Sequence, residues 1–315
     1  MKILLTGATG FVGKALAATL VRKAECILTC ALRQPSLGVP GKVVVTAELD
    51  DTADWSAAVA DQDVVIHAAA RAHVMNEEMV DPLEEYRRVN VRGTLRLARQ
   101  AAEAGVSRFV FVSSIKVNGE QTQCEAPFTA DDVPAPEDAY GLSKLEAELG
   151  LQQLASETGM EVVVIRPPLV YGPGVKGNFA TLIRLIDKGL PLPLGAVRNK
   201  RSLVALDNLV DLIIRCADHP AAANQVFLVS DGEDLSTTQL LRGVALAQDK
   251  AARLVPIPSS LLMLGAGVIG KKALAQRVLG CLQVDIAKTR NLLAWQPPLT
   301  LEDGLERCFI VRQNK

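Results

Sequence analysis

The stretch that decides the fold opens the chain: residues 2–24 read KILLTGATGFVGKALAATLVRKA. A short apolar run leads to three glycines, Gly7, Gly10 and Gly13, and an amphipathic stretch with one apolar helical face follows them. This order predicts a strand, a tight turn and a helix. Glycines in such a turn let backbone amides approach a pyrophosphate at the positive N-terminus of the helix. The stretch therefore predicts a dinucleotide-binding motif.

The same alternation continues through the first half of the chain. Four apolar segments separated by helical stretches follow: CILTCAL (26–32), KVVVTAEL (42–49), DVVIHAAA (63–70) and RFVFVSS (108–114). This pattern is typical of an α/β protein with a doubly wound parallel sheet, the Rossmann architecture.

The regular pattern ends after EVVVIRPPLVYGPG, residues 161–174. We therefore expect a nucleotide-binding domain over residues 1–167 and a smaller C-terminal substrate-binding lobe over residues 168–315. The apolar segment QVFLVSD (225–231) is predicted to return as a strand to the main sheet, which makes the two lobes interwoven.

Composition excludes several classes of function. The chain has 315 residues, 49% of them hydrophobic, and a net charge of −1 with acidic and basic residues mixed along the sequence, so there is no electrostatic footprint for nucleic acid or an anionic membrane, and neither is expected as a partner. Its six cysteines are scattered, without a C-x-x-C pair or a histidine cluster, which predicts buried thiols in a reducing cytoplasm and no metal site. The apolar run LLMLGAGVIG (261–270) is half a membrane span, and an interfacial helix is the alternative interpretation.

The end of the second predicted strand bears on the kind of dinucleotide. An acidic residue there would bind both ribose hydroxyls, whereas an arginine would face a 2′-phosphate. The chain has Ala31 and Arg33. This favours NADP(H), with NAD(H) as the alternative if Arg33 is a solvated loop residue.

The stretch DAYGLSKLEAE (138–148) places a tyrosine and a lysine four residues apart on a predicted helix. Residues at this spacing share a helical face, so the ammonium of Lys144 could hold the phenol of Tyr140 partly ionised at neutral pH. An ordinary solvated pair on a surface helix is the alternative.

Six motifs in order favour the catalytic interpretation: TGATGFVG, HAAA, VNVRGT, FVSSIKVNG, YGLSK and RPPLVYGPG. With them the chain resembles, nearly end to end, the extended short-chain dehydrogenase/reductase superfamily, specifically its nucleotide-sugar epimerases, dehydratases and reductases. Within it, the chain is most similar to a bacterial surface-polysaccharide subgroup of UDP-sugar 4-epimerases and UDP-4-keto-6-deoxy-N-acetylhexosamine 4-reductases.

The resemblance implies roles for individual residues. Tyr140 would exchange a proton with the sugar oxygen, Lys144 would lower the pKa of Tyr140 and bind the nicotinamide ribose, and Ser114 would orient the same oxygen. The implied cofactor contacts are Gly7, Gly10, Phe11, Val12, Gly13, Arg33, Glu48, Leu49, Ala68, Ala69, Ala70, Asn90, Tyr140, Lys144 and Pro167.

Departures from the superfamily pattern are informative. Ile115 and Lys116 stand where its 4,6-dehydratases carry an Asp-Glu pair, and Ile115 cannot transfer a proton, which argues against dehydratase activity. Lys116 either points into the sugar pocket or is solvated. Asn118 replaces a common tyrosine, and its role is open. His73, in the loop after the fourth strand, either touches substrate or is structural.

The second lobe is expected to hold the nucleoside diphosphate of a UDP-sugar. The resemblance implies contacts from Asn178, Phe179, Leu192, Leu194, Arg201 and Arg277, with Arg201 as the main phosphate ligand.

Three functions are consistent with these residues. The leading prediction is an NAD(P)H-dependent reductase acting on a UDP-2-acetamido-2,6-dideoxy-4-hexulose for surface-polysaccharide synthesis. A UDP-sugar 4-epimerase is the alternative, because the absence of an acid at position 31 is only a modest argument for an exchangeable cofactor. A non-catalytic NADP-binding regulator is a third, against which the complete Ser114, Tyr140 and Lys144 set counts. A homodimer is expected.

Overall fold

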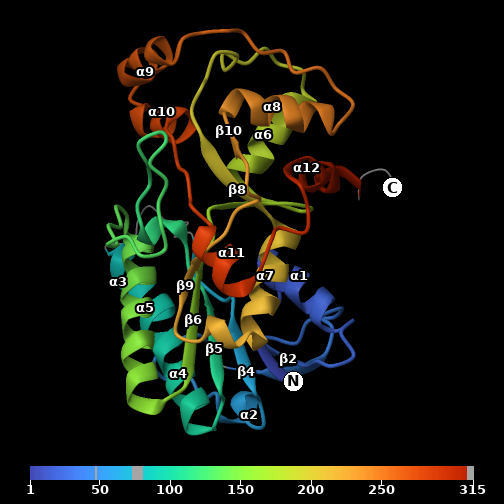
Figure 1. The fold of residues 1–315 in the computed structure, drawn as a ribbon, viewed down its shortest axis with the longest axis vertical. Helices are drawn as coiled ribbons and strands as arrows, with labels where there is room; N and C mark the ends of the chain where they lie inside the picture. The colour runs from blue at the N-terminus through green and yellow to red at the C-terminus, as the bar shows by residue number, and fades with distance from the viewer. Residues whose placement is uncertain (47, 73–80, 311–315) are drawn as a thin grey trace.

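The computed structural model describes residues 1–46, 48–72 and 81–310, and it confirms the α/β fold class (Figure 1). Within that part of the chain, the main sheet has seven parallel strands in the order β3-β2-β1-β4-β5-β6-β9. Their bounds are β1 (Lys2–Thr6), β2 (Ile27–Leu32), β3 (Lys42–Val45), β4 (Val64–His67), β5 (Arg108–Val112), β6 (Glu161–Arg166) and β9 (Val226–Leu228).

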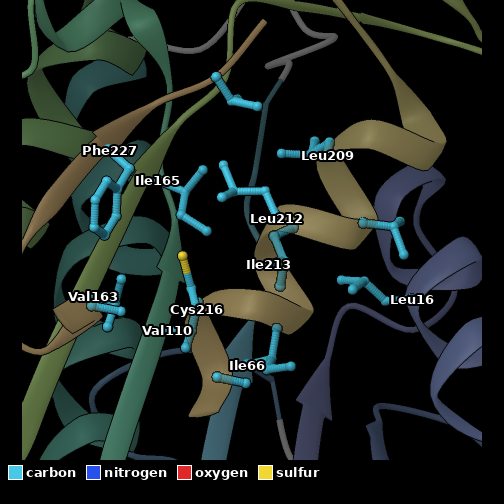
Figure 2. Close-up of a cluster of buried hydrophobic side chains, with 14 of the residues drawn as sticks. Leu16, Ile66, Val110, Val163, Ile165, Leu209, Leu212, Ile213, Cys216 and Phe227 are labelled. Carbon is cyan, nitrogen blue, oxygen red and sulfur yellow. The ribbon is translucent and has the colours of Figure 1, made fainter. Parts of the chain in front are cut away.

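Helices cover both faces of this sheet, which explains why its central strands are apolar throughout. On one face α1 (Phe11–Leu20) and α7 (Leu206–Asp218) pack on the sheet, and Figure 2 shows Leu212 and Ile213 of α7 near Val110 of β5 and Ile165 of β6. On the other face lie α2 (Ser56–Val59), α4 (Thr94–Glu103) and α5 (Ala139–Thr158). The carboxyl ends of the strands meet at one edge, where ligands of such folds bind.

A second, three-stranded sheet lies in the C-terminal part, in the order β10-β8-β7. It consists of β7 (Leu169–Tyr171), β8 (Arg201–Ala205) and β10 (Asp234–Leu235), and its core packs against α6 (Gly177–Asp187), α8 (Thr237–Leu246) and α12 (Leu301–Ile310). The chain crosses between the two parts. After β8 of the small sheet it forms α7, which packs on the main sheet, and β9, the edge strand of the main sheet; it then returns to the small sheet with β10. The proposed domain boundary at residue 167 stays a prediction.

The remaining elements connect these layers. They are α3 (Pro82–Tyr86), the π-helix η1 (Arg87–Gly93), the 3-10 helices η2 (Ile115–Val117) and η3 (Pro220–Ala222), α9 (Ser259–Val268), α10 (Lys272–Leu279) and α11 (Ala287–Leu293). No helix among the described residues combines the length and hydropathy needed to cross a membrane.

The expectation that all six cysteines are thiols is wrong for two of them. Cys124 and Cys281 form a disulfide with a Cα–Cα distance of 5.6 Å, within the usual range. The bond joins the loop after η2 to the segment after α10, 157 residues further along the chain. Sequence spacing could not reveal this pair, because the tertiary fold brings the two segments together.

Candidate active site

The glycine turn between β1 and α1 is as tight as the sequence predicts. Gly7 has φ +76°, and a Cβ on it would lie 2.7 Å from the backbone carbon of Ala68. A Cβ on Gly13 would lie 2.0 Å from the carbonyl oxygen of Gly7. Gly10 is the N-cap residue of α1, and no side chain caps the start of this helix. The first-turn amides, including those of Phe11 and Val12, therefore have no intrahelical acceptor and fit the pyrophosphate of a dinucleotide.

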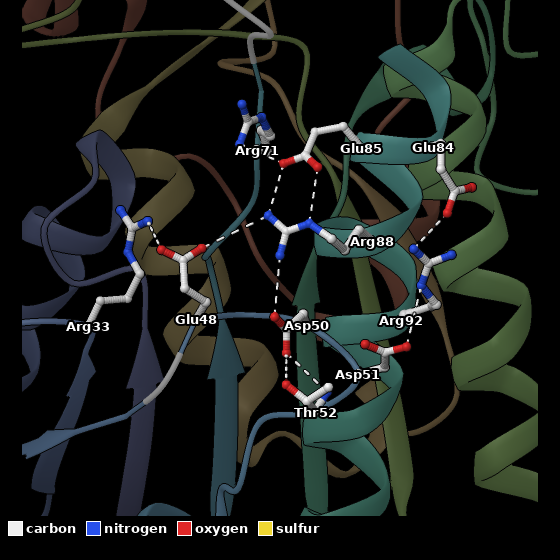
Figure 3. Close-up of polar contacts among 10 residues, drawn as sticks. All are labelled: Arg33, Glu48, Asp50, Asp51, Thr52, Arg71, Glu84, Glu85, Arg88 and Arg92. Atoms are coloured by element: carbon white, nitrogen blue, oxygen red, sulfur yellow. Dashed lines mark hydrogen bonds and ion pairs between the residues drawn. The ribbon is translucent and has the colours of Figure 1, made fainter. Parts of the chain in front are cut away.

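Arg33 does not stand alone at the end of β2. Its guanidinium lies 3.5 Å from the carboxylate of Glu48, which is also 4.0 Å from Arg88 (Figure 3). Leu49 follows Glu48 and packs against the core between the sheet and α4. The ribose end of the predicted cofactor site thus carries a carboxylate, supplied by the segment after β3 in place of the second strand.

An ion-pair ladder holds that segment to the π-helix η1. Arg88 contacts Asp50 at 3.3 Å and Arg92 contacts Asp51 at 3.7 Å, and the same arginines pair with Glu85 at 3.0 Å and Glu84 at 2.7 Å on α3. Single exposed pairs of this kind stabilise little, but a network of them orders a loop. Arg88 was not among the residues predicted from the sequence, although it lies four and three residues after Glu84 and Glu85.

Lys144 lies at the centre of the site and is buried. Its Nζ donates to the carbonyl oxygen of Val112, 2.8 Å away, and stands 3.9 Å from the ring centroid of Phe111. Burial lowers the pKa of Lys144 to about 7, against the opposing charge of Glu148. The ammonium is therefore held at the end of β5, where the chain runs into Ser113 and Ser114.

Tyr140 starts the first turn of α5, half-buried, with its ring edge-on to Tyr86 at 5.9 Å between centroids. Burial raises its pKa to about 12, and the charges of Asp138 and Tyr86 act in the same direction. Burial dominates the pKa of this phenol, and the Lys144 ammonium donates to Val112, so in this structure it does not hold Tyr140 partly ionised as the sequence predicted. Tyr140 is a protonated phenol at neutral pH.

Ser114 follows β5 and caps η2, where its Oγ accepts from the backbone amide of Lys116 at 3.3 Å. Its neighbour Ser113 donates to Glu148, and Glu148 forms a buried ion pair with Arg166 at 2.6 Å. Arg166 in turn donates to Asn118 at 3.0 Å. This network ties β5, α5 and β6 together behind the catalytic candidates and gives Asn118 a structural role.

Lys116 does not point freely into a sugar pocket. Its Nζ pairs with Glu120 at 2.9 Å and with Asp138, whose other oxygen caps α5 by accepting from the amide of Gly141 at 2.7 Å. Neither interpretation from the sequence included these ion pairs, which fix Lys116 to the start of the helix that carries Tyr140; a sugar contact by Lys116 stays a prediction.

The side chains of Asn90 and His67 form hydrogen bonds within the protein. The Asn90 amide donates to Ser143 at 3.1 Å and accepts from the Arg71 amide at 2.8 Å, so it joins η1, α5 and the loop after β4. His67 is bonded to Thr6 and Thr94, and burial lowers its pKa to about 3, with the Lys144 charge adding to the effect. His67 is thus neutral, a feature that the sequence analysis did not identify.

Three small residues complete the sheet edge. Ala68 and Ala69 border the glycine turn, and Ala70 beyond them is exposed. The buried Pro167 follows β6, and its carbonyl oxygen accepts from the amide of Ile115 at 3.0 Å.

In the second lobe, Arg201 begins β8. It is half-buried on β8 and donates to the carbonyl oxygen of Gly280 at 3.1 Å, and among the described residues it has no carboxylate partner. Burial without a counter-charge lowers its pKa. Arg277 on α10 lies 3.8 Å from Glu120 of the first lobe. Both arginines could bind an anion at the junction of the lobes.

The other predicted substrate contacts differ in how accessible they are. Phe179 is fully buried and stacks on Tyr171 at 5.5 Å, so only its backbone could reach a ligand. Leu192 is buried and Leu194 is half-buried in the same core. Asn178 lies in the first turn of α6, and nothing further is described of its side chain. His73 lies outside the described residues.

Comparison with known families agrees with this geometry. A family described as the NAD dependent epimerase/dehydratase family matches residues 3–230. The chain belongs to this family. The resemblance to extended short-chain dehydrogenases/reductases inferred from the motifs is thereby confirmed, and the chain is an enzyme of the nucleotide-sugar epimerase and oxidoreductase class.

Three individual proteins show which members of the family this chain is similar to. The UDP-glucose 4-epimerase of Vibrio cholerae is 50% identical over 99% of this chain and 97% of its own length. The solved UDP-glucose 4-epimerase of Thermotoga maritima with UDP-glucose covers 100% of this chain at a TM-score of 0.78 and 23% identity. The UDP-glucuronic acid 4-epimerase of Bacillus cereus with NAD covers 99% at 0.78 and 21%. At these identities the two solved structures show the fold alone.

Proposed function

We propose that the protein is a UDP-sugar 4-epimerase that uses a nicotinamide dinucleotide. The observation that carries the proposal is the 50% identity to a UDP-glucose 4-epimerase over 99% of the chain. The presence of Ser114, Tyr140 and Lys144 in the expected motifs supports the same proposal, with Ser114 directly after β5 and the Lys144 ammonium bonded to Val112 at the end of that strand. This identity supports the alternative made from the sequence, a 4-epimerase, better than the leading prediction of a 4-keto sugar reductase.

Each of three residues would have a separate role in the epimerisation. A bound nicotinamide would supply the hydride acceptor and donor. Tyr140 would take the proton from the sugar C4 hydroxyl during oxidation and return it during reduction, and Ser114 would hold the same oxygen by a hydrogen bond. Lys144 would favour the ionised form of Tyr140 once its ammonium turns from Val112 toward the ligands. Inversion at C4 requires the keto sugar to present its other face before reduction.

We infer that NAD(H) is preferred to NADP(H), which revises the preference predicted from Arg33. The carboxylate of Glu48 lies 3.5 Å from that guanidinium and would repel a 2′-phosphate brought to it. A carboxylate can instead accept a hydrogen bond from a ribose hydroxyl. A retained cofactor also suits an epimerase, because each turnover regenerates the starting redox state.

The cofactor assignment predicts an effect of Glu48→Gln. Removing the negative charge should raise the affinity for NADP(H) relative to NAD(H) by roughly tenfold, the size of one charged hydrogen bond. Fluorescence titration with both reduced cofactors measures the ratio. Arg33→Ala is the paired variant. The preference for NADP(H) predicted from the sequence would be restored by two results together: Arg33→Ala loses NADP(H) affinity but keeps its NAD(H) affinity, and Glu48→Gln changes neither affinity.

The substrate assignment predicts an effect of Arg201→Ala. Because the Arg201 guanidinium has no carboxylate partner among the described residues and donates only to the carbonyl oxygen of Gly280, we propose that it binds the diphosphate, and its loss should raise KM for the UDP-sugar by about 10- to 100-fold and leave cofactor affinity unchanged. Steady-state kinetics and cofactor titration measure both quantities. Arg242→Ala, an exposed arginine on α8, is the matched control. An unchanged KM in Arg201→Ala would remove it from the site.

The reaction itself is tested by incubating the protein with UDP-glucose, UDP-N-acetylglucosamine or UDP-glucuronic acid and NAD, followed by NMR of the products. Conversion of one of them to its C4 epimer is expected. If none is converted and only a 4-keto-6-deoxy sugar is reduced, the proposal is wrong. The homodimer, the cytoplasmic location and the role in surface-polysaccharide synthesis stay predictions.

A further inference from the structure

Helix α9 exposes an apolar face that no part of the described chain covers. Leu261, Leu264 and Val268, at spacings of three and four residues, lie on this face, and the last two are 71% and 83% exposed. Ile269 at its end is 67% exposed, and no residue of α9 is buried. Figure 1 shows α9 at the outer end of the smaller lobe, far from the main sheet.

The segment around α9 differs in charge from the rest of the chain. Residues 250–284 contain Lys250, Arg253, Lys271, Lys272 and Arg277 and no aspartate or glutamate, although the whole chain has a net charge of −1. Lys250 pairs with Asp187 and Arg277 lies near Glu120, but the other three cations form no ion pair with any described residue. Whole-chain charge conceals this segregation.

We propose that α9 and the lysines after it dock on the surface of an anionic lipid bilayer. The apolar face would enter the boundary between headgroups and acyl chains, while Lys271 and Lys272 would contact the headgroup phosphates. The adjoining α10 carries Arg277, so docking would bring the substrate lobe to the membrane surface.

The dimensions and charges favour this occupant over two others. Ten residues of helix extend about 15 Å, half of the roughly 30 Å of a hydrocarbon core, so α9 lies in the interface and does not span it. A second copy of the chain would bring one cationic segment against another, which is unfavourable. An anionic surface instead complements both features of the segment, its apolar face and its positive charge.

The test is flotation of the full-length protein with lipid vesicles. Vesicles of phosphatidylethanolamine and phosphatidylglycerol should carry the protein upward at about 10 mM salt, where the Debye length is about 30 Å, and less of it at about 1 M. Phosphatidylcholine vesicles should bind at least tenfold less. Absence of binding to the anionic vesicles, or equal binding to both compositions, would overturn the proposal.

Two variants locate the docking site. Leu264→Ser with Val268→Ser, and separately Lys271→Glu with Lys272→Glu, should each reduce flotation at least tenfold while epimerase activity on a dissolved UDP-sugar stays unchanged. Matched controls are Leu246→Ser, exposed on α8, and Lys23→Glu with Lys42→Glu, which should float as the wild type does. Undiminished flotation of both α9-region variants refutes the site. A wild-type dimer in sedimentation velocity that dissociates in Leu264→Ser/Val268→Ser would assign the face to a second copy instead.

Discussion

Tyr140→Phe is expected to lower kcat for epimerisation by at least about 100-fold, because the variant keeps the ring but cannot donate or accept the proton. The edge-on contact with Tyr86 involves the rings, so the start of α5 should keep its structure. Affinity for the cofactor should change little. Steady-state kinetics and a cofactor titration on the same preparation measure both effects.

The ionisation state of Tyr140 also predicts how kcat depends on pH. Burial raises the pKa of Tyr140 to about 12, so proton uptake from a sugar hydroxyl at neutral pH requires a lower pKa of Tyr140 in the reacting complex. Wild-type kcat should therefore rise with pH on the acid side, and the residual activity of Tyr140→Phe should not. Near-wild-type turnover in the variant would refute the catalytic assignment.

Lys144→Met should impair both chemistry and cofactor binding, lowering kcat by at least about 100-fold and cofactor affinity by about tenfold. Methionine keeps most of the length and the apolar contact with Phe111 but removes the ammonium. Isothermal titration with NAD and steady-state kinetics separate the two losses. Unchanged cofactor affinity would refute a ribose contact by Lys144.

The same variant has a stability signature with a defined sign. Burial lowers the pKa of Lys144 to about 7 from 10.5, so between these values the unfolded chain binds more protons than the folded one. The contribution of this lysine to stability is therefore present above pH 10.5 and is lost as the pH falls to 7. Lys144→Met should lack this slope in denaturant unfolding measured from pH 7 to 10. An identical slope in both proteins would show that the lysine is not buried in solution.

The parts of the fold that rest on local sequence were predictable. The glycine turn, the parallel strands and the helix with Tyr140 and Lys144 follow from periodicity and turn chemistry within short windows. The tight contact of Gly13 with Gly7 gives the physical reason for the pattern.

Features that depend on distant segments were not predictable from the same information. The sequence predicts Lys116 as a candidate sugar ligand, and only the fold shows that Asp138 lies beside it. The sequence predicts Cys124 as a thiol, and only the fold shows its disulfide with Cys281. Glu48 is separated from Arg33 by a whole strand, so the sequence at the end of β2 alone could not show that a carboxylate lies beside this guanidinium. The network of Glu148 and Arg166 likewise joins a helix to a strand.

The central claim is that one carbon of the sugar is oxidised and then reduced on the same protein, and cofactor stoichiometry tests it most directly. The purified protein, supplied with less NAD than sugar, is incubated with UDP-galactose while absorbance at the reduced-nicotinamide band and UDP-glucose formation are followed together. A second reaction contains a UDP-4-keto-6-deoxy sugar and a reduced cofactor in place of UDP-galactose and NAD. We predict many molecules of UDP-glucose per NAD with no net change in absorbance in the first reaction. No UDP-glucose in the first reaction, together with consumption of one reduced cofactor per 4-keto sugar in the second, would contradict the account and identify a reductase.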